Sequence, residues 1–258
     1  MNKLATITFS ALILLAGCGG GKIEITPPAV APDPAAITDK LESRLANACS
    51  FAARASGKFT SPKLSGDITV NLYFDSPKTA GVEISSMLGA MAVIGSDEER
   101  LWQRSYQGDN QTCYIYPRKY ADACARGSAL PILNPELVMG FLQPDMIRGS
   151  RLVFHDNRWR FECYDSRGRM SYAFNPLTNL IEEIEMENGT FIRLGGYEEI
   201  APGFEVPRDV YVRSGKMEFK LHCGKLKAFE FTDAMKQKFF TPPESDTRLT
   251  LTEDCRFE

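Results

Sequence analysis

The sequence predicts an α+β protein that is mostly β, in which one curled antiparallel sheet of about ten strands is closed by a leading helix and a short central helix. Three observations support this fold class. Apolar and polar residues alternate with period two along most of the chain, which is typical of strands with one face on a core. One helical stripe precedes the strands, and one cap-and-proline signal interrupts them midway. A sheet with this many strands curls rather than stays flat.

Cys18 ends a run that is typical of a bacterial lipoprotein signal. Lys3 precedes an apolar stretch over 4–15, and Leu15-Ala16-Gly17-Cys18 completes it in the order of a lipobox. We therefore expect cleavage before Cys18, removal of residues 1–17 and a diacylglyceryl group on the Cys18 thiol. An uncleaved transmembrane helix is the disfavoured alternative, because a span needs about 20 apolar residues. No second apolar run is long enough, so the lipid is the predicted anchor.

Residues 18–35 are predicted to tether the lipid to the folded part. Three glycines follow Cys18 and prolines occur in the second half, so the tether starts flexible and ends extended, with a reach of roughly 50 Å. Gly19 stands where an aspartate favours inner-membrane retention in some bacteria, so we expect an anchor in the outer membrane, facing the periplasm. Residues 36–258 are expected to form a single domain.

The leading helix is predicted over 37–55. Apolar residues at steps of three and four form one stripe, and they are Ile37, Leu41, Leu45, Ala48, Ala52 and Ala55. Thr38 or Asp39 is the expected cap, and Gly57 follows the expected end.

The first strands are predicted from period-two alternation after this helix. The apolar positions are Ile68, Val70, Leu72, Phe74, Val82 and Ile84, followed by an apolar run over 87–94 that contains Gly89, and by Trp102, Tyr114 and Tyr116. Asn134 and Pro135 then open a short central helix that runs to about Leu142 and is closed by Pro144. Residues 117–127 are expected to hold another helical turn.

A second series of strands is predicted from Arg151 onward. Its apolar residues lie at 152–154, 159–163, 170–174, 181–186, 191–194, 210–212, 217–223 and 226–231. Asn188-Gly189 is the strongest hairpin signal in the chain.

The charge balance gives no basis for nucleic-acid binding. Loss of Lys3 with the signal leaves 29 of the 30 basic side chains against 33 acidic ones, and this is no strong basic field. A metal site is disfavoured because no Cys-x-x-Cys occurs and both His155 and His222 stand alone. We expect no cofactor and a monomer.

Six cysteines remain besides Cys18, and they are Cys49, Cys113, Cys124, Cys163, Cys223 and Cys255. An even number in an exported chain indicates up to three disulfides, and six cysteines allow about 15 pairings that sequence does not distinguish. Cys113 and Cys124 can close a short loop. Cys49 and Cys255 can tie the two ends of the domain. Cys163 and Cys223 can pair across the sheet.

Several segments resemble the outer-membrane lipoprotein receptor and the periplasmic lipoprotein carrier, a LolA/LolB-like superfamily. The most specific segment is Val82-Glu83-Ile84-Ser85-Ser86-Met87-Leu88-Gly89 with the strand over 90–94, which is similar to the receptor's strand, Pro-Leu-Gly loop and strand. The segments 134–144, 203–208 and 238–243 also resemble the superfamily, and the element order matches over nearly the whole mature chain. Met87 stands where the family usually has proline, and the six cysteines and the tail after Pro243 are further departures.

The resemblance implies a half-open barrel whose helices form a lid over an apolar cavity that holds acyl chains in the known relatives. It also implies that Leu88, in a loop of Met87, Leu88 and Gly89, touches a membrane; burial of Leu88 in the strand run is the alternative. Large aromatic residues are the candidate cavity lining, and they are Phe74, Trp102, Phe154, Trp159, Phe161 and Phe174. These rings fill a packed core under the alternative interpretation.

Catalysis is disfavoured. No Gly-x-Ser-x-Gly elbow occurs, His155 adjoins Asp156 at a predicted turn, and His222 and Cys223 face opposite ways on one strand. The acidic segment 182–187 is interpreted as an exposed strand. The favoured function is therefore a membrane-anchored lipoprotein that binds an acyl chain or a lipidated protein and takes part in its transfer. The alternative is a structural or interaction lipoprotein of the envelope with a filled core.

Overall fold

The computed structural model describes residues 31–106, 112–124, 135–165, 168–244 and 247–258. Cys18, the tether up to residue 30 and the expected cap Asn134 lie outside these residues. The helices are α1 (Pro34–Ala46), α2 (Arg118–Cys124), α3 (Pro135–Val138), α4 (Pro144–Arg148) and α5 (Asp233–Phe239). The strands are β1 (Phe51–Thr60), β2 (Ser65–Ser76), β3 (Thr79–Ser86), β4 (Gly89–Ser96), β5 (Arg100–Ser105), β6 (Thr112–Pro117), β7 (Arg151–His155), β8 (Arg158–Asp165), β9 (Gly168–Phe174), β10 (Ile181–Met186), β11 (Phe191–Gly195), β12 (Glu198–Ala201), β13 (Phe204–Val206), β14 (Asp209–Ser214), β15 (Met217–Cys223), β16 (Lys227–Ala228) and β17 (Thr247–Thr250).

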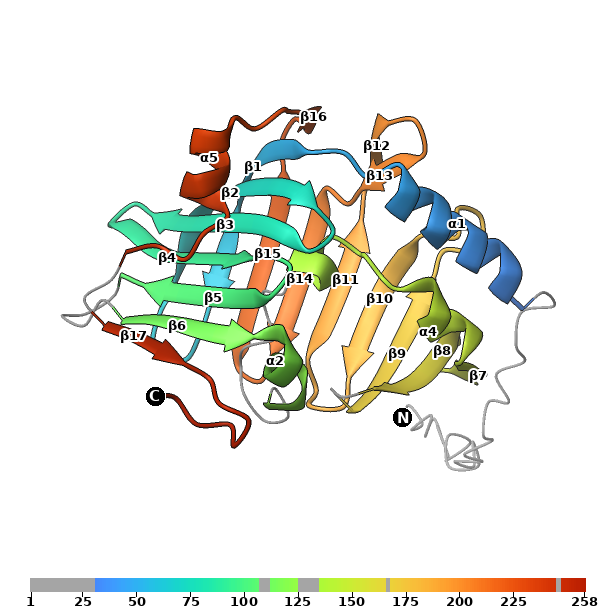
Figure 1. The fold of residues 1–258 in the computed structure, drawn as a ribbon. Coiled ribbons are helices and arrows are strands. Elements are labelled where there is room, and N and C mark those ends of the chain that lie inside the picture. The colour runs from blue at the N-terminus through green and yellow to red at the C-terminus, as the bar shows by residue number, and fades with distance from the viewer. Residues whose placement is uncertain (1–30, 107–111, 125–134, 166–167, 245–246) are drawn as a thin grey trace, which may run out of the picture.

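One large curled sheet dominates the fold (Figure 1). Its strand order is β17-β6-β5-β4-β3-β2-β1-β15-β14-β11-β10-β9-β8-β7, with β16 also paired to β1, and β12 and β13 form a separate hairpin. All pairs are antiparallel except β17 with β6. The predicted fold class is confirmed. The described residues nevertheless form 17 strands rather than about ten, because strands of two to four residues, such as β13, β16 and β17, are too short to show a period.

The leading helix is shorter than predicted. Asp33 caps α1 in place of Thr38 or Asp39, since its Oδ1 accepts a hydrogen bond from the Ala35 N–H at 2.9 Å. The expected helical end over 51–55 is wrong, because these residues belong to β1. The alanines of this stretch are compatible with both the helical and the strand spacing. The stretch pairs with β2 as a strand, and this pairing buries its alternate residues. Gly57 is no helix stop either: a Cβ there would lie 1.8 Å from the Lys220 carbonyl oxygen on β15.

The two faces of the sheet follow from its register. We call the face that carries Val70 the inner face. Val70 is opposite Ala55 on β1 and Ile84 on β3. On the more distant strands of the sheet, Ile192 and Tyr172 lie on the same face. These residues are buried in one core together with residues of α1 and of the segment that contains α3 and α4. The helices therefore close the inner face, as predicted.

The central helical segment differs in detail from its prediction. Pro144 does not close a helix; it is the first residue of α4, with Gln143 as the N-cap. The expected single helix is therefore two short ones, α3 and α4, joined by residues 139–143. The helical turn expected within 117–127 is confirmed as α2. None of the described helices is long and apolar enough to span a bilayer.

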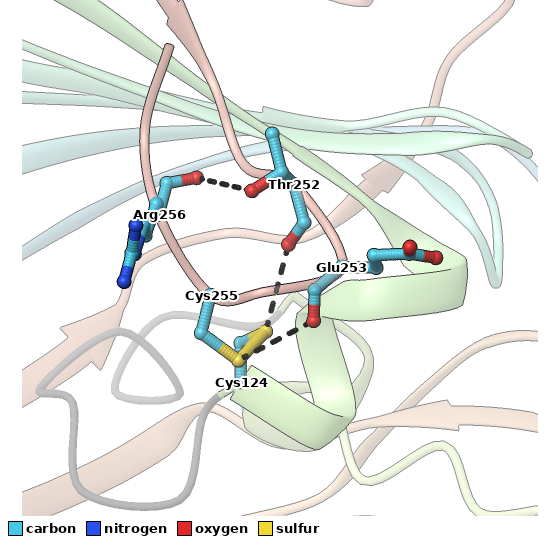
Figure 2. The surroundings of a disulfide bond; sticks show 5 residues. All are labelled: Cys124, Thr252, Glu253, Cys255 and Arg256. Carbon is cyan, nitrogen blue, oxygen red and sulfur yellow. Dashed lines mark hydrogen bonds between the residues drawn. A yellow bond between two sulfur atoms is a disulfide. The ribbon is translucent and has the colours of Figure 1, made fainter.

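The C-terminal tail returns to the sheet edge and is tied there by a disulfide (Figure 2). Pairing of β17 with β6 brings Cys255 to Cys124 of α2, and the two sulfur atoms are bonded. The pairings Cys113–Cys124 and Cys49–Cys255 are therefore wrong, since parallel strand pairing, not closeness in sequence, selects the partner. Two additional thiols, Cys113 and Cys49, are unbonded.

The suggested Cys163–Cys223 pairing is also wrong, because Cys223 is a free thiol. Both residues are buried on the inner face, as their parity predicts. Four strands separate β8 from β15 in the sheet order, whereas a disulfide needs Cα atoms closer than about 7 Å.

Candidate functional site

The β3–β4 hairpin carries the most exposed large apolar side chains of the described residues. Met87 and Leu88 occupy its two-residue turn, and each is 96% exposed. Gly89 follows with a φ of +114°, a backbone conformation that other residues rarely adopt, and Ser86 Oγ accepts a hydrogen bond from the Leu88 N–H at 3.2 Å. The alternative placement of Leu88 inside a strand is wrong. The turn therefore holds two adjacent large apolar side chains in water.

The neighbouring β1–β2 turn lies at the same end of the sheet. Its conformation is defined by Ser61, whose Oγ accepts hydrogen bonds from the Leu64 and Lys63 N–H groups and donates one to the Leu64 carbonyl. Leu64 is exposed. A pocket of about 660 Å³ lies between the two turns. Apolar residues of both hairpins line it, namely Phe59, Leu64, Ile68, Met87, Leu88 and Met91, and Lys63 and Tyr106 line it as well. Its size is that of a small-molecule site.

Five of the six predicted lining aromatics lie on the inner face, where Phe74, Phe161 and Phe174 are buried. Phe74 stacks on Phe51 and on Phe141, with ring centroids 5.0 and 5.1 Å apart, and Phe204 also contacts it. Phe161 packs edge to face on Phe174 at 5.6 Å.

The Phe74 cluster is therefore packed ring against ring. Phe154 and Trp159 form another edge-to-face pair at the β7 edge and are half-buried. None of the three pockets described for this chain is lined by any of the six predicted aromatics.

Trp102 does not line the inner face. It is opposite Gly95, which is opposite Gly81 and then Tyr73, so all four lie on the outer face. Trp102 covers Gly95 so closely that a Cβ there would be 2.4 Å from the indole ring. The C-terminal segment covers the same face, since the Phe239 ring of α5 stacks on Tyr73 at 3.8 Å. Apolar character alone does not reveal this placement, because a tail packs on the outer face here.

Arg44 holds the helices over the inner face, and sequence analysis missed it. Only 1% of Arg44 is exposed. Its guanidinium donates hydrogen bonds to the carbonyls of Gly140 at 2.8 Å, Met139 at 3.3 Å and Glu205 at 2.7 Å. Desolvation lowers the pKa of Arg44, while Tyr197 and Glu205 act in the opposite direction. Its signal in the sequence is a charge three residues after Leu41, on the apolar stripe of α1.

The acidic strand β10 is not fully exposed, contrary to its interpretation. Glu183 lies on the outer face and is 4% exposed. Arg160 contacts its carboxylate at 2.8 Å, and Arg193 and Arg158 at 3.2 and 3.5 Å. Arginine side chains from β8 and β11 therefore cover the carboxylate, and only the pairing of strands in the folded sheet brings them there.

The histidines form no recognisable catalytic arrangement. His155 and Asp156 are exposed at a turn, as predicted. His222 and Cys223 face opposite ways, also as predicted, since one is exposed and the other buried. The His222 Nδ1 lies 2.6 Å from Asp209 Oδ1. The described residues contain no group of three or more His, Cys, Asp or Glu side chains that could hold a metal ion.

Comparison with protein-family models gives no match, and comparison with curated proteins gives none either. Among solved structures, the chain is similar to an outer membrane lipoprotein-sorting protein domain from Vibrio parahaemolyticus, with 9% identity, a TM-score of 0.51, and coverage of 79% of this chain and 95% of that one. A LolA superfamily protein from Nitrosomonas europaea shares 12% identity at a TM-score of 0.49, over 82% of this chain and 98% of that one. A DUF1329 family protein from Desulfovibrio piger shares 9% identity at a TM-score of 0.49, over 79% and 97%. The likeness to the Vibrio domain concerns the fold alone, and it agrees with the predicted curled antiparallel sheet covered by helices.

Proposed function

We propose that this protein is a lipid-handling lipoprotein of the cell envelope. In this proposal Cys18 carries a diacylglyceryl anchor in the outer membrane, facing the periplasm, and residues 36–258 form one domain. The domain binds an acyl chain or a lipidated protein and takes part in its transfer. The likeness of its fold to the lipoprotein-sorting domain from Vibrio parahaemolyticus supports a role of this class.

The observation that carries the proposal is the exposed pair Met87 and Leu88 beside the 660 Å³ apolar pocket. Transfer of one large apolar side chain from water to an apolar phase is worth about 1.5–3 kcal/mol. Two such side chains at one turn give a weak, reversible contact with a bilayer. A pocket at the base of the same turn lies where a lipid chain would leave that bilayer.

Vesicle flotation tests the membrane contact. The mature chain, residues 18–258 with Cys18→Ser, should float with phosphatidylcholine vesicles, and Leu88→Asp should abolish flotation. Leu177→Asp is the matched control, because Leu177 is 91% exposed on the β9–β10 turn at the opposite end of the sheet. Equal flotation of all three chains would refute the role of Leu88.

Native mass spectrometry of the same chain tests ligand binding. A bound mass of a phospholipid or fatty acid supports lipid handling. An empty chain that also fails to take up a fluorescent fatty acid refutes it.

A second candidate function is an interaction lipoprotein with a filled interior. The observation that favours it is the ring cluster of Phe51, Phe74, Phe141 and Phe204, which occupies the inner face beneath the helices. Under this proposal the empty chain is the native state, and the exposed Met87–Leu88 turn contacts a protein partner.

A further inference from the structure

The outer face carries a hollow on the opposite side of the sheet from the packed core. One pocket of about 460 Å³ crosses β11, β14, β15 and β1, and a second of about 390 Å³ continues over β2 to Met87. The two pockets share Ser56, Gly57 and Lys58. We call their combined volume the outer hollow.

Two lysines of the outer hollow stand directly opposite each other. Lys58 of β1 is the register partner of Lys220 of β15, and like charges in this position destabilise a sheet. Gly57 strengthens the juxtaposition, because its missing side chain lets β1 approach the Lys220 backbone. Among the described residues Lys58 has no ion-pair partner, and Lys220 reaches Glu218 only at 4.0 Å.

Two carboxylates, Asp67 and Asp209, also line the hollow, but neither is within ion-pair distance of Lys58 or Lys220 among the described contacts. Asp209 is engaged by His222 at 2.6 Å. Asp67, the register partner of Lys58 on β2, is exposed and not within ion-pair distance of it among the described contacts. Gly195 adds open space beside Asp209, since nothing lies within 4 Å of where its Cβ would be. The hollow therefore presents two ammonium groups and the Ser56 hydroxyl around a space that suits an anionic group.

The outer hollow lies level with the base of the exposed β3–β4 turn. Gly57 is opposite Ile68, which is opposite Ser86, so Lys58 is one residue beyond the level of Ser86. Neighbouring strands are about 4.8 Å apart, so Lys58 lies roughly 10 Å from the turn that carries Leu88. When the Met87–Leu88 turn enters a bilayer, the two lysines lie at the depth of the lipid headgroups.

We propose that the outer hollow binds the phosphate of an anionic phospholipid headgroup while the Met87–Leu88 turn lies in the same bilayer. This inference rests on the proposed membrane contact and specifies that the contacted lipid is anionic. The turn supplies apolar burial, which is independent of headgroup charge. Lys58 and Lys220 supply an electrostatic contribution to membrane binding, which requires anionic lipid and weakens as the salt concentration rises.

The test compares two vesicle compositions and three chains. The mature chain with Cys18→Ser is measured against phosphatidylcholine vesicles and against vesicles in which phosphatidylglycerol replaces part of the phosphatidylcholine. Lys58→Gln/Lys220→Gln is the test variant. Lys225→Gln/Lys227→Gln is the control, because it removes the same charge from exposed positions at the far end of β15.

The Cys18→Ser chain and the control variant should bind vesicles with phosphatidylglycerol more tightly than vesicles of phosphatidylcholine alone. In the test variant each lysine removed should reduce this gain in affinity about fivefold. All three chains should bind phosphatidylcholine equally. An equal gain in all three chains would overturn the headgroup assignment while leaving the Leu88 contact intact. Absence of binding to either vesicle would overturn both. Saturation of the hollow by millimolar inorganic phosphate, seen as His222 NMR shifts without a gain from phosphatidylglycerol, would identify a free anion and overturn the lipid assignment.

Discussion

Replacing Arg44 with methionine tests how the helices are held over the inner face. Arg44 is the point where α1, the segment after α3 and β13 meet, because its guanidinium donates to carbonyls of Met139, Gly140 and Glu205. Methionine keeps most of the length and the apolar stem of arginine but provides no donor.

The expected cost follows from those three carbonyls. A buried acceptor that loses its donor costs about 1–3 kcal/mol. Removing a desolvated charge offsets part of the sum, and breaking a buried ionic contact by deleting one partner costs about 3–5 kcal/mol. We therefore expect Arg44→Met to lower the free energy of unfolding by about 3–5 kcal/mol.

Urea unfolding with hydrogen exchange measures this effect. The midpoint should fall at an unchanged m-value, and amides of residues 137–148 should lose protection before those of the sheet. Lys40→Met is the control on the same helix, because Lys40 makes a partly exposed ion pair with Glu205 and should cost no more than about 1 kcal/mol. Equal costs for the two variants would refute the reasoning.

Three further predictions concern the core, the disulfide and pH. Phe74→Ala removes a ring between Phe51 and Phe141 and should cost about 3–5 kcal/mol in urea; unchanged stability with lost fatty-acid uptake would instead identify a cavity wall. Cys255→Ser should lower the Tm by the equivalent of about 2–4 kcal/mol, and reductant should lower the Tm of wild type but not of the variant. Burial, with a smaller effect of Asp209, raises the pKa of the Cys223 thiol from 9.0 to about 11. Its stability contribution is thus complete below pH 9 and is lost as pH rises through about 11; Cys223→Ala should lack this loss in unfolding measurements across that range.

The local features of the fold were predictable because they depend on neighbours in sequence. Period-two alternation identified β2, β3 and the strands from β8 to β11, since a half-buried strand needs that pattern. Gly89 after two apolar residues indicated the turn at Met87 and Leu88. The end of α1 was not predictable from spacing, because the alanines at 48, 52 and 55 are consistent with a helical stripe. Pairing of β1 with β2 makes residues 51–55 a strand.

Positions on the two faces required the register. Trp102 has the same apolar character as Phe74, but pairing with Gly95, which in turn pairs with Gly81, places it on the outer face. The burial of Arg44 also required the tertiary structure, because the carbonyls that it contacts belong to residues 139, 140 and 205. The outer hollow likewise joins Lys58 and Lys220, which are 162 positions apart in sequence and adjacent only through the β1–β15 pairing.

The sequence by itself determined the mostly β fold class and the curl expected of many strands, and Gly89 favoured a turn at Met87 and Leu88, because composition, period and turn chemistry act over a few residues. Tertiary structure alone decided the Cys124–Cys255 bond, the packed state of the Phe74 cluster and the lysine pair of the outer hollow. Each of these depends on which strands become neighbours, and that choice minimises the free energy of the whole sheet and not of any one segment.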